Sequence, residues 1–196
     1  MLAYYTRDDY EIIEGVKIMA PSPGWGHNTV TTNLIKIIGT YVSINKLGIC
    51  FGDHMDVHFP DGNIFQPDFI FISAEKAKLF FTDKNATLHG VPDMVVEIFS
   101  KSTMKRDVGI KKDVYERNGV REYWIIDPWR ETIDAYILRD GKYELGGHYE
   151  NWIDDELAER AELPEDEQPE VKMEIPVDVL DGFKVKIRNI FGWYFE

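Results

Sequence analysis

The chain has 196 residues, of which 44% are hydrophobic and 13% aromatic, so we expect a single globular domain over residues 1–196 and not a disordered chain. It has no long uncharged apolar run and only one cysteine, Cys50, which excludes a membrane span and an internal disulfide and fits a reducing cytoplasm. The formal net charge of −13 argues against a general nucleic-acid binder, because such proteins usually present a basic surface.

The first half of the chain has the patterns of a hairpin, a helix and paired strands. Apolar residues recur every three or four positions between His27 and Gly48, which predicts an amphipathic helix. The turn signal at residues 60–63 predicts that the strand-like runs on either side of it pair with each other. The expected elements are a hairpin, a helix, two paired strands and a short helix with a loop, over residues 10–19, 27–47, 49–59 with 64–72, and 74–90.

The second half alternates strands and helices before a polar stretch. The dipeptide Asn118-Gly119 is typical of a helix end, and Pro128 stops the strand that follows. The expected elements are a strand, a helix, a strand, a hairpin, a polar stretch and an edge strand, over residues 94–99, 105–118, 123–127, 132–138 with 142–145, 148–170 and 183–187. This order predicts an α/β fold with a mixed central sheet flanked by helices, not a doubly wound parallel sheet.

Charge is distributed unevenly along the chain. Ten acidic and two basic residues lie between positions 154 and 174, so we expect an acidic polar insertion at about residues 148–170. Five basic residues and one acidic residue lie between positions 101 and 112. If this second stretch borders a functional site, it provides a local basic rim that receives phosphate while the remaining surface repels it.

Two strand-like runs, residues 66–72 and 94–100, each carry one acid in an otherwise apolar sequence, Asp68 and Glu97. A charge in such a strand is seldom buried unless it is paired or binds a metal. Mg²⁺ is usually held by one or two carboxylates together with waters and phosphate oxygens. If the strands are neighbours, the pair predicts a magnesium-dependent phosphodiesterase site; the alternative is that both acids lie at strand ends and point into solvent.

A lysine is the remaining part of such a site, because it orients the attacking water or offsets the charge of the transition state. The commonest nuclease arrangement places the lysine two residues after the second acid, where this chain has Phe99. The nearest substitute is Lys111, which shares one helix face with Asp107 and Tyr115 at four-residue spacing. The same spacing fits an ordinary surface pair of Asp107 and Lys111 worth about 0.3–0.5 kcal/mol, with Tyr115 only packing.

A series of short motifs follows one order along most of the chain, at residues 10–15, 21–23 with His27, 66–68, 95–103, 107–111 with Tyr115, and 119–128. In this order and spacing the chain resembles the Uma-two family of restriction-endonuclease-like proteins, which belongs to the PD-(D/E)xK nuclease superfamily. The resemblance implies a restriction-endonuclease-like fold, Asp68 and Glu97 as metal ligands, and Lys111 as the displaced lysine. It also matches Glu11 to an acidic position that assists the site.

These observations together predict a metal-dependent endonuclease that hydrolyses DNA phosphodiester bonds with Mg²⁺ or Mn²⁺, without a small-molecule cofactor. We expect His27 at the start of a helix on the rim of the site, and a homodimer, because endonucleases that cut both strands commonly pair two sites. The aromatic residues 191–195 either contribute to that dimer contact or close the core of the monomer. The alternative function is a noncatalytic module of the same fold that uses its acidic surface to bind a protein partner.

Overall fold

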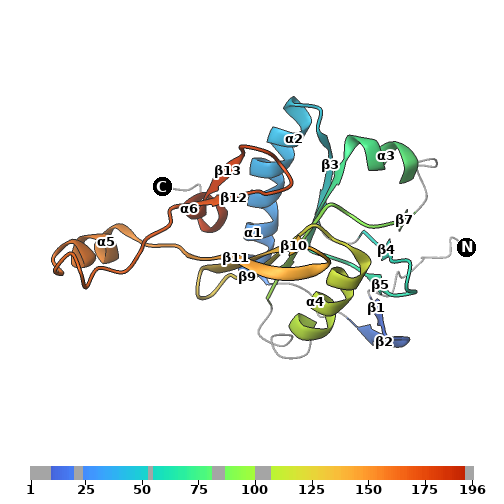
Figure 1. Cartoon of the computed structure of the whole chain (residues 1–196), viewed down its shortest axis with the longest axis horizontal. Coiled ribbons are helices and arrows are strands. Elements are labelled where there is room, and N and C mark those ends of the chain that lie inside the picture. Colours follow the sequence, from blue (N-terminus) through green and yellow to red (C-terminus); the bar gives the residue numbers. More distant parts are fainter. Residues whose placement is uncertain (1–9, 20–23, 53–54, 81–86, 100–106, 193–196) are drawn as a thin grey trace, which may run out of the picture.

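A six-stranded mixed sheet forms the centre of the computed structural model, which describes residues 10–19, 24–52, 55–80, 87–99 and 107–192 (Figure 1). Its strands are β3 (Gly48–Gly52), β6 (Phe69–Ser73), β8 (Met94–Ile98), β9 (Glu122–Asp127), β10 (Thr132–Arg139) and β11 (Lys142–Glu150). The strand order is β11-β10-β9-β8-β6-β3, and only β8 and β9 are parallel neighbours within it. A parallel pair needs a long crossover, which the helix between β8 and β9 supplies.

A second sheet of five short strands lies beside the first. Its strands are β1 (Tyr10–Ile13), β2 (Val16–Met19), β4 (Val57–His58), β5 (Ile64–Phe65) and β7 (Leu88–His89), in the order β2-β1-β5-β4-β7. The predicted hairpin at residues 10–19 is confirmed as β1 and β2. Glu14 and Gly15 both have positive φ angles in its turn, as a two-residue hairpin turn requires.

Helices cover both faces of the main sheet. The helical segments are α1 (Trp25–Leu34), the π-helical η1 (Ile35–Gly39), α2 (Thr40–Ile44), α3 (Ala74–Phe80), α4 (Asp107–Asn118), α5 (Asp154–Ala161) and α6 (Ile187–Phe191). The first face packs against α1, η1, α2 and α6, and the second packs against α4 and the small sheet. Neighbouring residues of β6 therefore enter different cores, with Phe69 in the first and Ile70 in the second. Coverage of both faces explains why this strand reads as a continuous apolar run.

The structure corrects three expected boundaries. The runs 49–59 and 64–72 do not form one hairpin: β3 pairs with β6 in the main sheet, whereas β4 pairs with β5 in the small sheet. Apolar alternation identifies a strand but not its partner, so the change of sheet after Gly52 left no signal. The expected helix begins at Trp25 and includes a π-helical stretch, and residues 148–150 belong to β11, not to the polar stretch.

The acidic polar stretch leaves the body of the protein between β11 and β12 (Glu174–Pro176), and Figure 1 shows α5 projecting away from the two sheets. The chain then returns as β12 and β13 (Lys184–Lys186), which form a two-stranded antiparallel sheet. Ile190 and Phe191 of α6 pack in the first core. Phe191 therefore helps to close the core of the monomer, which is one of the two roles expected for residues 191–195. Residues 193–196 lie outside the described residues. Within the described ranges, the helices are all too short or too polar to cross a membrane.

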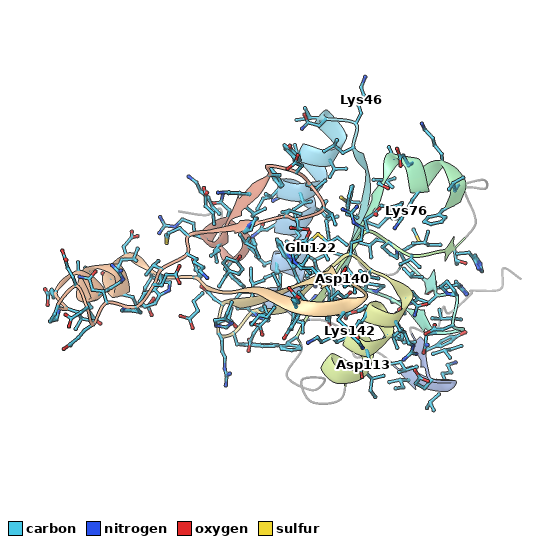
Figure 2. The ribbon with its side chains drawn as sticks, in the orientation of Figure 1. Lys46, Lys76, Asp113, Glu122, Asp140 and Lys142 are labelled. Carbon is cyan, nitrogen blue, oxygen red and sulfur yellow. The ribbon has the colours of Figure 1, made fainter. Side chains whose placement is uncertain are left out.

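Glu122, labelled in Figure 2, is the first residue of β9, and its hydrogen bond with Val179 links this strand to the C-terminal segment. The carboxylate is completely buried, and it accepts hydrogen bonds from Trp124 Nε1 at 2.8 Å and from the backbone N–H of Val179 at 2.9 Å. Burial raises the pKa of Glu122 to about 7, although these hydrogen bonds act in the opposite direction. The charged form is therefore expensive in this position at neutral pH.

We expect Glu122→Ala to lower the free energy of unfolding by ~2–4 kcal/mol at about pH 5, because the buried Trp124 N–H and the partly buried Val179 N–H lose their acceptor. The loss should be smaller at about pH 8. A carboxyl whose pKa is raised on folding contributes most stability below its unfolded pKa, near ~4.3, and that contribution falls as the pH rises through about 7. Urea denaturation of both proteins at the two pH values measures the difference, and a loss that grows toward pH 8 would contradict this assignment.

Candidate active site

Asp68 and Glu97 lie side by side at one edge of the main sheet. Phe69 of β6 is paired with Val96 of β8 in antiparallel register, so the next pair outward is Asp68 with Glu97. Paired residues of antiparallel strands point to the same face. The backbone N–H of Ile98 donates a 2.6 Å hydrogen bond to Asp68 Oδ2, which holds the first carboxylate against the second strand. Asp68, directly before β6, and Glu97 in β8 therefore lie next to each other and are largely buried, and the solvent-exposed alternative does not describe them.

Lys111 reaches this edge from α4. Its side chain is only 7% exposed, and its ammonium lies 3.0 Å from Glu97 Oε2 and 2.7 Å from Glu11 Oε1. The alternative of a partly exposed surface pair with Asp107 is therefore wrong for Lys111, because the lysine turns inward to two carboxylates. Asp107 is the first residue of α4, and its side chain lies outside the described residues.

Glu11 joins the small sheet to the same site. It is buried in β1, and its Oε1 atom accepts from Lys111 Nζ and from the backbone N–H of Gln66 at 3.0 Å. The side chain of Gln66 in turn donates to Asp56 Oδ1 at 2.7 Å. No site role was predicted for Gln66 or Asp56, because these contacts join positions 55 and 10 residues apart and follow no local period. The sequence Gln66-Pro67-Asp68 offered the only local signal for Gln66.

Tyr115 and His27 complete the arrangement, one on each carboxylate. The Tyr115 hydroxyl donates to Glu97 Oε1 at 2.5 Å, and its buried ring packs edge-on against Phe65 with 5.4 Å between ring centroids. His27, near the start of α1, places Nε2 2.9 Å from Asp68 Oδ1. The structure therefore brings together six of the seven residues that the sequence singled out, and leaves only the side chain of Asp107 undescribed.

The electrostatics of the cluster are dominated by buried negative charge. Burial raises the pKa of Glu97 to about 8, and the nearby charges of Asp68 and Glu11 act in the same direction, while Lys111 opposes them. Burial alone would lower the pKa of Lys111, but Glu97 and Glu11 outweigh it and raise that pKa above its usual value. If all three carboxylates are ionised and His27 is neutral, the formal charge of the cluster is −2, and the raised pKa of Glu97 shows that this charge is unfavourable without a further positive charge. A divalent cation has the charge that compensates it.

The donor set fits a hard cation better than zinc. Asp68 and Glu97 supply carboxylate oxygens on one face, and Mg²⁺ is typically held by one or two such groups with waters and phosphate oxygens. Within residues 10–19, 24–52, 55–80, 87–99 and 107–192, no group of three or more histidine, cysteine or acidic residues is arranged to hold a metal by itself. Any ion at this site would therefore depend on two protein carboxylates and on oxygens from water or substrate.

The basic rim expected at residues 101–112 is described only in its last part. Lys101, Lys105 and Arg106 lie outside the described residues. Lys111 is buried in the cluster, and the ammonium of Lys112 lies 3.7 Å from the centre of the Tyr136 ring, outside the cluster. The two neighbouring lysines of α4 therefore have different surroundings, which makes them a matched pair for experiments.

Comparisons with known proteins identify the family and the fold. The model of the Uma2 family, described as "putative restriction endonuclease", matches residues 2–173. No curated protein matches the chain. The crystal structure of a "putative nuclease belonging to DUF820" from Anabaena variabilis is similar, with a TM-score of 0.71 and 19% identity, over 96% of this chain and 92% of that chain. This likeness confirms the predicted fold, an α/β restriction-endonuclease-like fold with a mixed central sheet flanked by helices. The family model spans most of the sequence, so the chain belongs to the Uma2 family.

Proposed function

We propose that this protein is an endonuclease that hydrolyses DNA phosphodiester bonds with a divalent cation and water as the nucleophile. The observation that carries the proposal is the contact of Lys111 with Glu97 at the sheet edge where Asp68 is the neighbouring residue. Membership of the Uma2 family supports a nuclease at a coarser level. The metal requirement, the DNA substrate and the residue roles are our proposals.

Asp68 and Glu97 are the residues that would hold Mg²⁺ or Mn²⁺. Such an ion, when bound, polarises the scissile phosphate and acidifies a water molecule. Each carboxylate is positioned by a second residue, Asp68 by the Ile98 N–H and Glu97 by the Tyr115 hydroxyl. Supports of this kind fix the direction of a ligand and are expected around a metal site.

Lys111 supplies the only ammonium in the described cluster. From α4 it would orient the attacking water or stabilise the negative charge that develops on the phosphate, provided that its contact with Glu97 opens toward substrate. Glu11 holds the lysine from the other side at 2.7 Å and keeps it charged. Glu11 would therefore position Lys111, and Lys111 would contact the reacting atoms directly.

We expect Mg²⁺ or Mn²⁺ at about ten times its dissociation constant to raise the melting temperature by ~3–5 °C, because a ligand that binds only the folded state stabilises it. Asp68→Asn and Glu97→Gln should lose most of this shift. Glu116→Gln is the control, because Glu116 lies on the same helix but bonds Lys142 at the surface. Differential scanning calorimetry with and without metal measures the shift, and equal shifts in all four proteins would refute the assignment of these ligands.

Lys111→Gln should reduce DNA cleavage by about 100-fold or more, because the transition state loses a positioned positive charge. Lys112→Gln should cleave nearly as the wild type does, since Lys112 contacts Tyr136 instead of the cluster. The comparison controls for a general loss of positive charge, which both variants share.

The same variant is expected to be less stable. Lys111 is buried between two carboxylates, so its removal should cost ~3–5 kcal/mol. Cleavage must therefore be measured below the melting temperature of each variant, with folding checked by circular dichroism. Lys111→Arg retains the charge with a different shape and provides a second variant if Lys111→Gln does not fold. Folded Lys111 variants that cleave at the wild-type rate would rule out a catalytic role for this residue.

We also propose a homodimer, on the general ground that two active sites are needed to cut both strands of a duplex and that twofold dimers are the commonest oligomers. Phe191 is buried inside the monomer, so it is not available for the dimer contact. Static light scattering at micromolar concentration should give twice the monomer mass of 22.8 kDa. A mass near that of one chain would exclude the dimer.

The noncatalytic alternative is favoured by one feature, the projecting segment around α5 (Figure 1). Its first turn carries Asp154, Asp155 and Glu156, and it exposes the apolar residues Ile153 and Leu163. Such a surface suits a basic protein partner better than DNA. If the wild type cleaves no DNA with either metal, this binding function becomes the better explanation of the fold.

A further inference from the structure

The two edge strands of the main sheet differ in how they are protected. β11, at one edge, contains the ionisable residues Lys142, Glu144, His148 and Glu150, and a register shift interrupts its pairing with β10. Charges and irregularities of this kind keep an edge strand from pairing with another chain. β3 (Gly48–Gly52), at the other edge, has no charged residue and no proline, and it pairs with β6 in unbroken register. Its open side therefore lacks these protections.

The ladder with β6 identifies the backbone groups on the open side of β3. The N–H of Ala74 donates to the carbonyl of Leu47 at 2.8 Å, one position beyond the pair of Gly48 and Ser73. Hydrogen-bonded and non-hydrogen-bonded pairs alternate in an antiparallel ladder, so Gly48 and every second residue after it do not bond to β6. The residues whose N–H and C=O groups point to the open side are Gly48, Cys50 and Gly52. In the described part of the chain, β3 has no second neighbouring strand and no other backbone group bonds to these three residues.

A second copy of β3 matches these groups and the side chains beside them. In antiparallel pairing, all three outward residues find a partner only when Cys50 lies opposite its own copy on a twofold axis. Ile49 of one copy then lies opposite Phe51 of the second copy, on the same face of the sheet. Ile49 is 38% exposed, and an aromatic residue opposite a β-branched one stabilises strand pairing.

The charge of this region also suits a second copy. The chain has 35 acidic residues and a net charge of −13, so two copies repel each other in most orientations. Residues 24–52, which form α1, η1, α2 and β3, contain no acidic residue and only two lysines. Two copies that meet at β3 therefore avoid placing the carboxylates of one strand opposite those of the other.

The strand pair needs additional surface to form a stable dimer. Stable interfaces bury about 800 Å² on each partner, which is more than two short strands cover. α2 and α3 contact β3 (Figure 1), α2 on the face of the first core and α3 on the face of the second. Each helix carries a strongly exposed apolar residue, Ile44 on α2 and Leu79 on α3. Apolar surface is therefore available beside the strand on both faces of the sheet.

We propose that β3 pairs with β3 of a second copy, in antiparallel register about Cys50, and joins the two six-stranded sheets into one continuous sheet. The inference rests on the homodimer proposed above and does not require nuclease activity. The twofold axis of such a pair is perpendicular to the sheet. The candidate active sites of both copies therefore lie on the same face of the joined sheet.

The first test is Cys50→Pro, compared with wild type by sedimentation velocity over a range of micromolar concentrations in reducing buffer. The N–H of Cys50 points to the open side, so proline removes no hydrogen bond within the chain but blocks pairing with a second copy. We expect the wild type to sediment as a dimer and Cys50→Pro as a monomer. Cys50→Ala is the control: it lacks the thiol but keeps the N–H, and it should remain a dimer.

A second pair of variants keeps the test informative if Cys50→Pro does not fold. Ile49→Lys places two like charges about 7–8 Å apart across the twofold axis, and it should raise the dissociation constant of the dimer by about ten-fold or more. Leu145→Lys makes the same exchange on β11, where Leu145 is exposed at the opposite edge, and it should leave the dissociation constant unchanged. Circular dichroism checks that each variant is folded.

A dimer that Cys50→Pro and Ile49→Lys leave intact would overturn the β3 interface while the homodimer stands. Dissociation of Cys50→Ala, or of Leu145→Lys to the same extent as Ile49→Lys, would also overturn it. A monomeric wild type would overturn both the homodimer and this interface. Failure of the nuclease proposal gives a different result, which is a wild-type dimer that depends on β3 but cleaves no DNA in Mg²⁺ or Mn²⁺.

Discussion

The contact of one buried lysine with two carboxylates determines how the candidate site is assembled. Lys111 comes from α4, Glu97 from the main sheet and Glu11 from the small sheet, so three separate parts of the fold meet at one ammonium group. If any of these parts shifts, a charge is left buried without its partner, which is costly in a protein interior. The positions of the small sheet and of α4 on the second face of the main sheet are therefore tied to the integrity of this cluster.

Stability alone does not explain such a cluster. A buried ion pair gains little or nothing over apolar residues of the same volume, because desolvation offsets the attraction. In this cluster the cost of desolvation is offset even less, because the carboxylates outnumber the one ammonium and burial raises the pKa of Glu97 to about 8. Strongly shifted groups gathered at a sheet edge are typical of functional sites. This excess of buried carboxylates is the physical reason to propose a cation at this edge of the fold.

Local pattern was sufficient to predict some of this site, and long-range packing supplied the rest. Asp68 and Glu97 were identifiable because each interrupts an apolar run, and Lys111 and Tyr115 because residues four apart share a helix face. The contact of Glu11 with Lys111 spans 100 positions and that of Gln66 with Glu11 spans 55, so no local period encodes them. For the same reason the sequence indicated the strands on either side of residues 60–63 but not their division between two sheets. Glu122 was missed because one acid at the start of a strand gives no sign of whether it is buried.

The position of the lysine follows from how the end of β8 is packed. A lysine two residues after Glu97 would share the face of Glu97, and this chain has Phe99 there, partly buried against the second core. Phe99 adds apolar surface to the second core, against which α4 also packs. The Lys111 ammonium reaches to within 3.0 Å of Glu97 from α4, on the same face of the sheet. A lysine at position 99 and a lysine on α4 can each place one positive charge beside Glu97, because the contact depends on the position of the ammonium group and not on the element that carries the lysine. In the proposed site the lysine comes from helix α4 instead of the strand, and Glu11 is its second carboxylate partner.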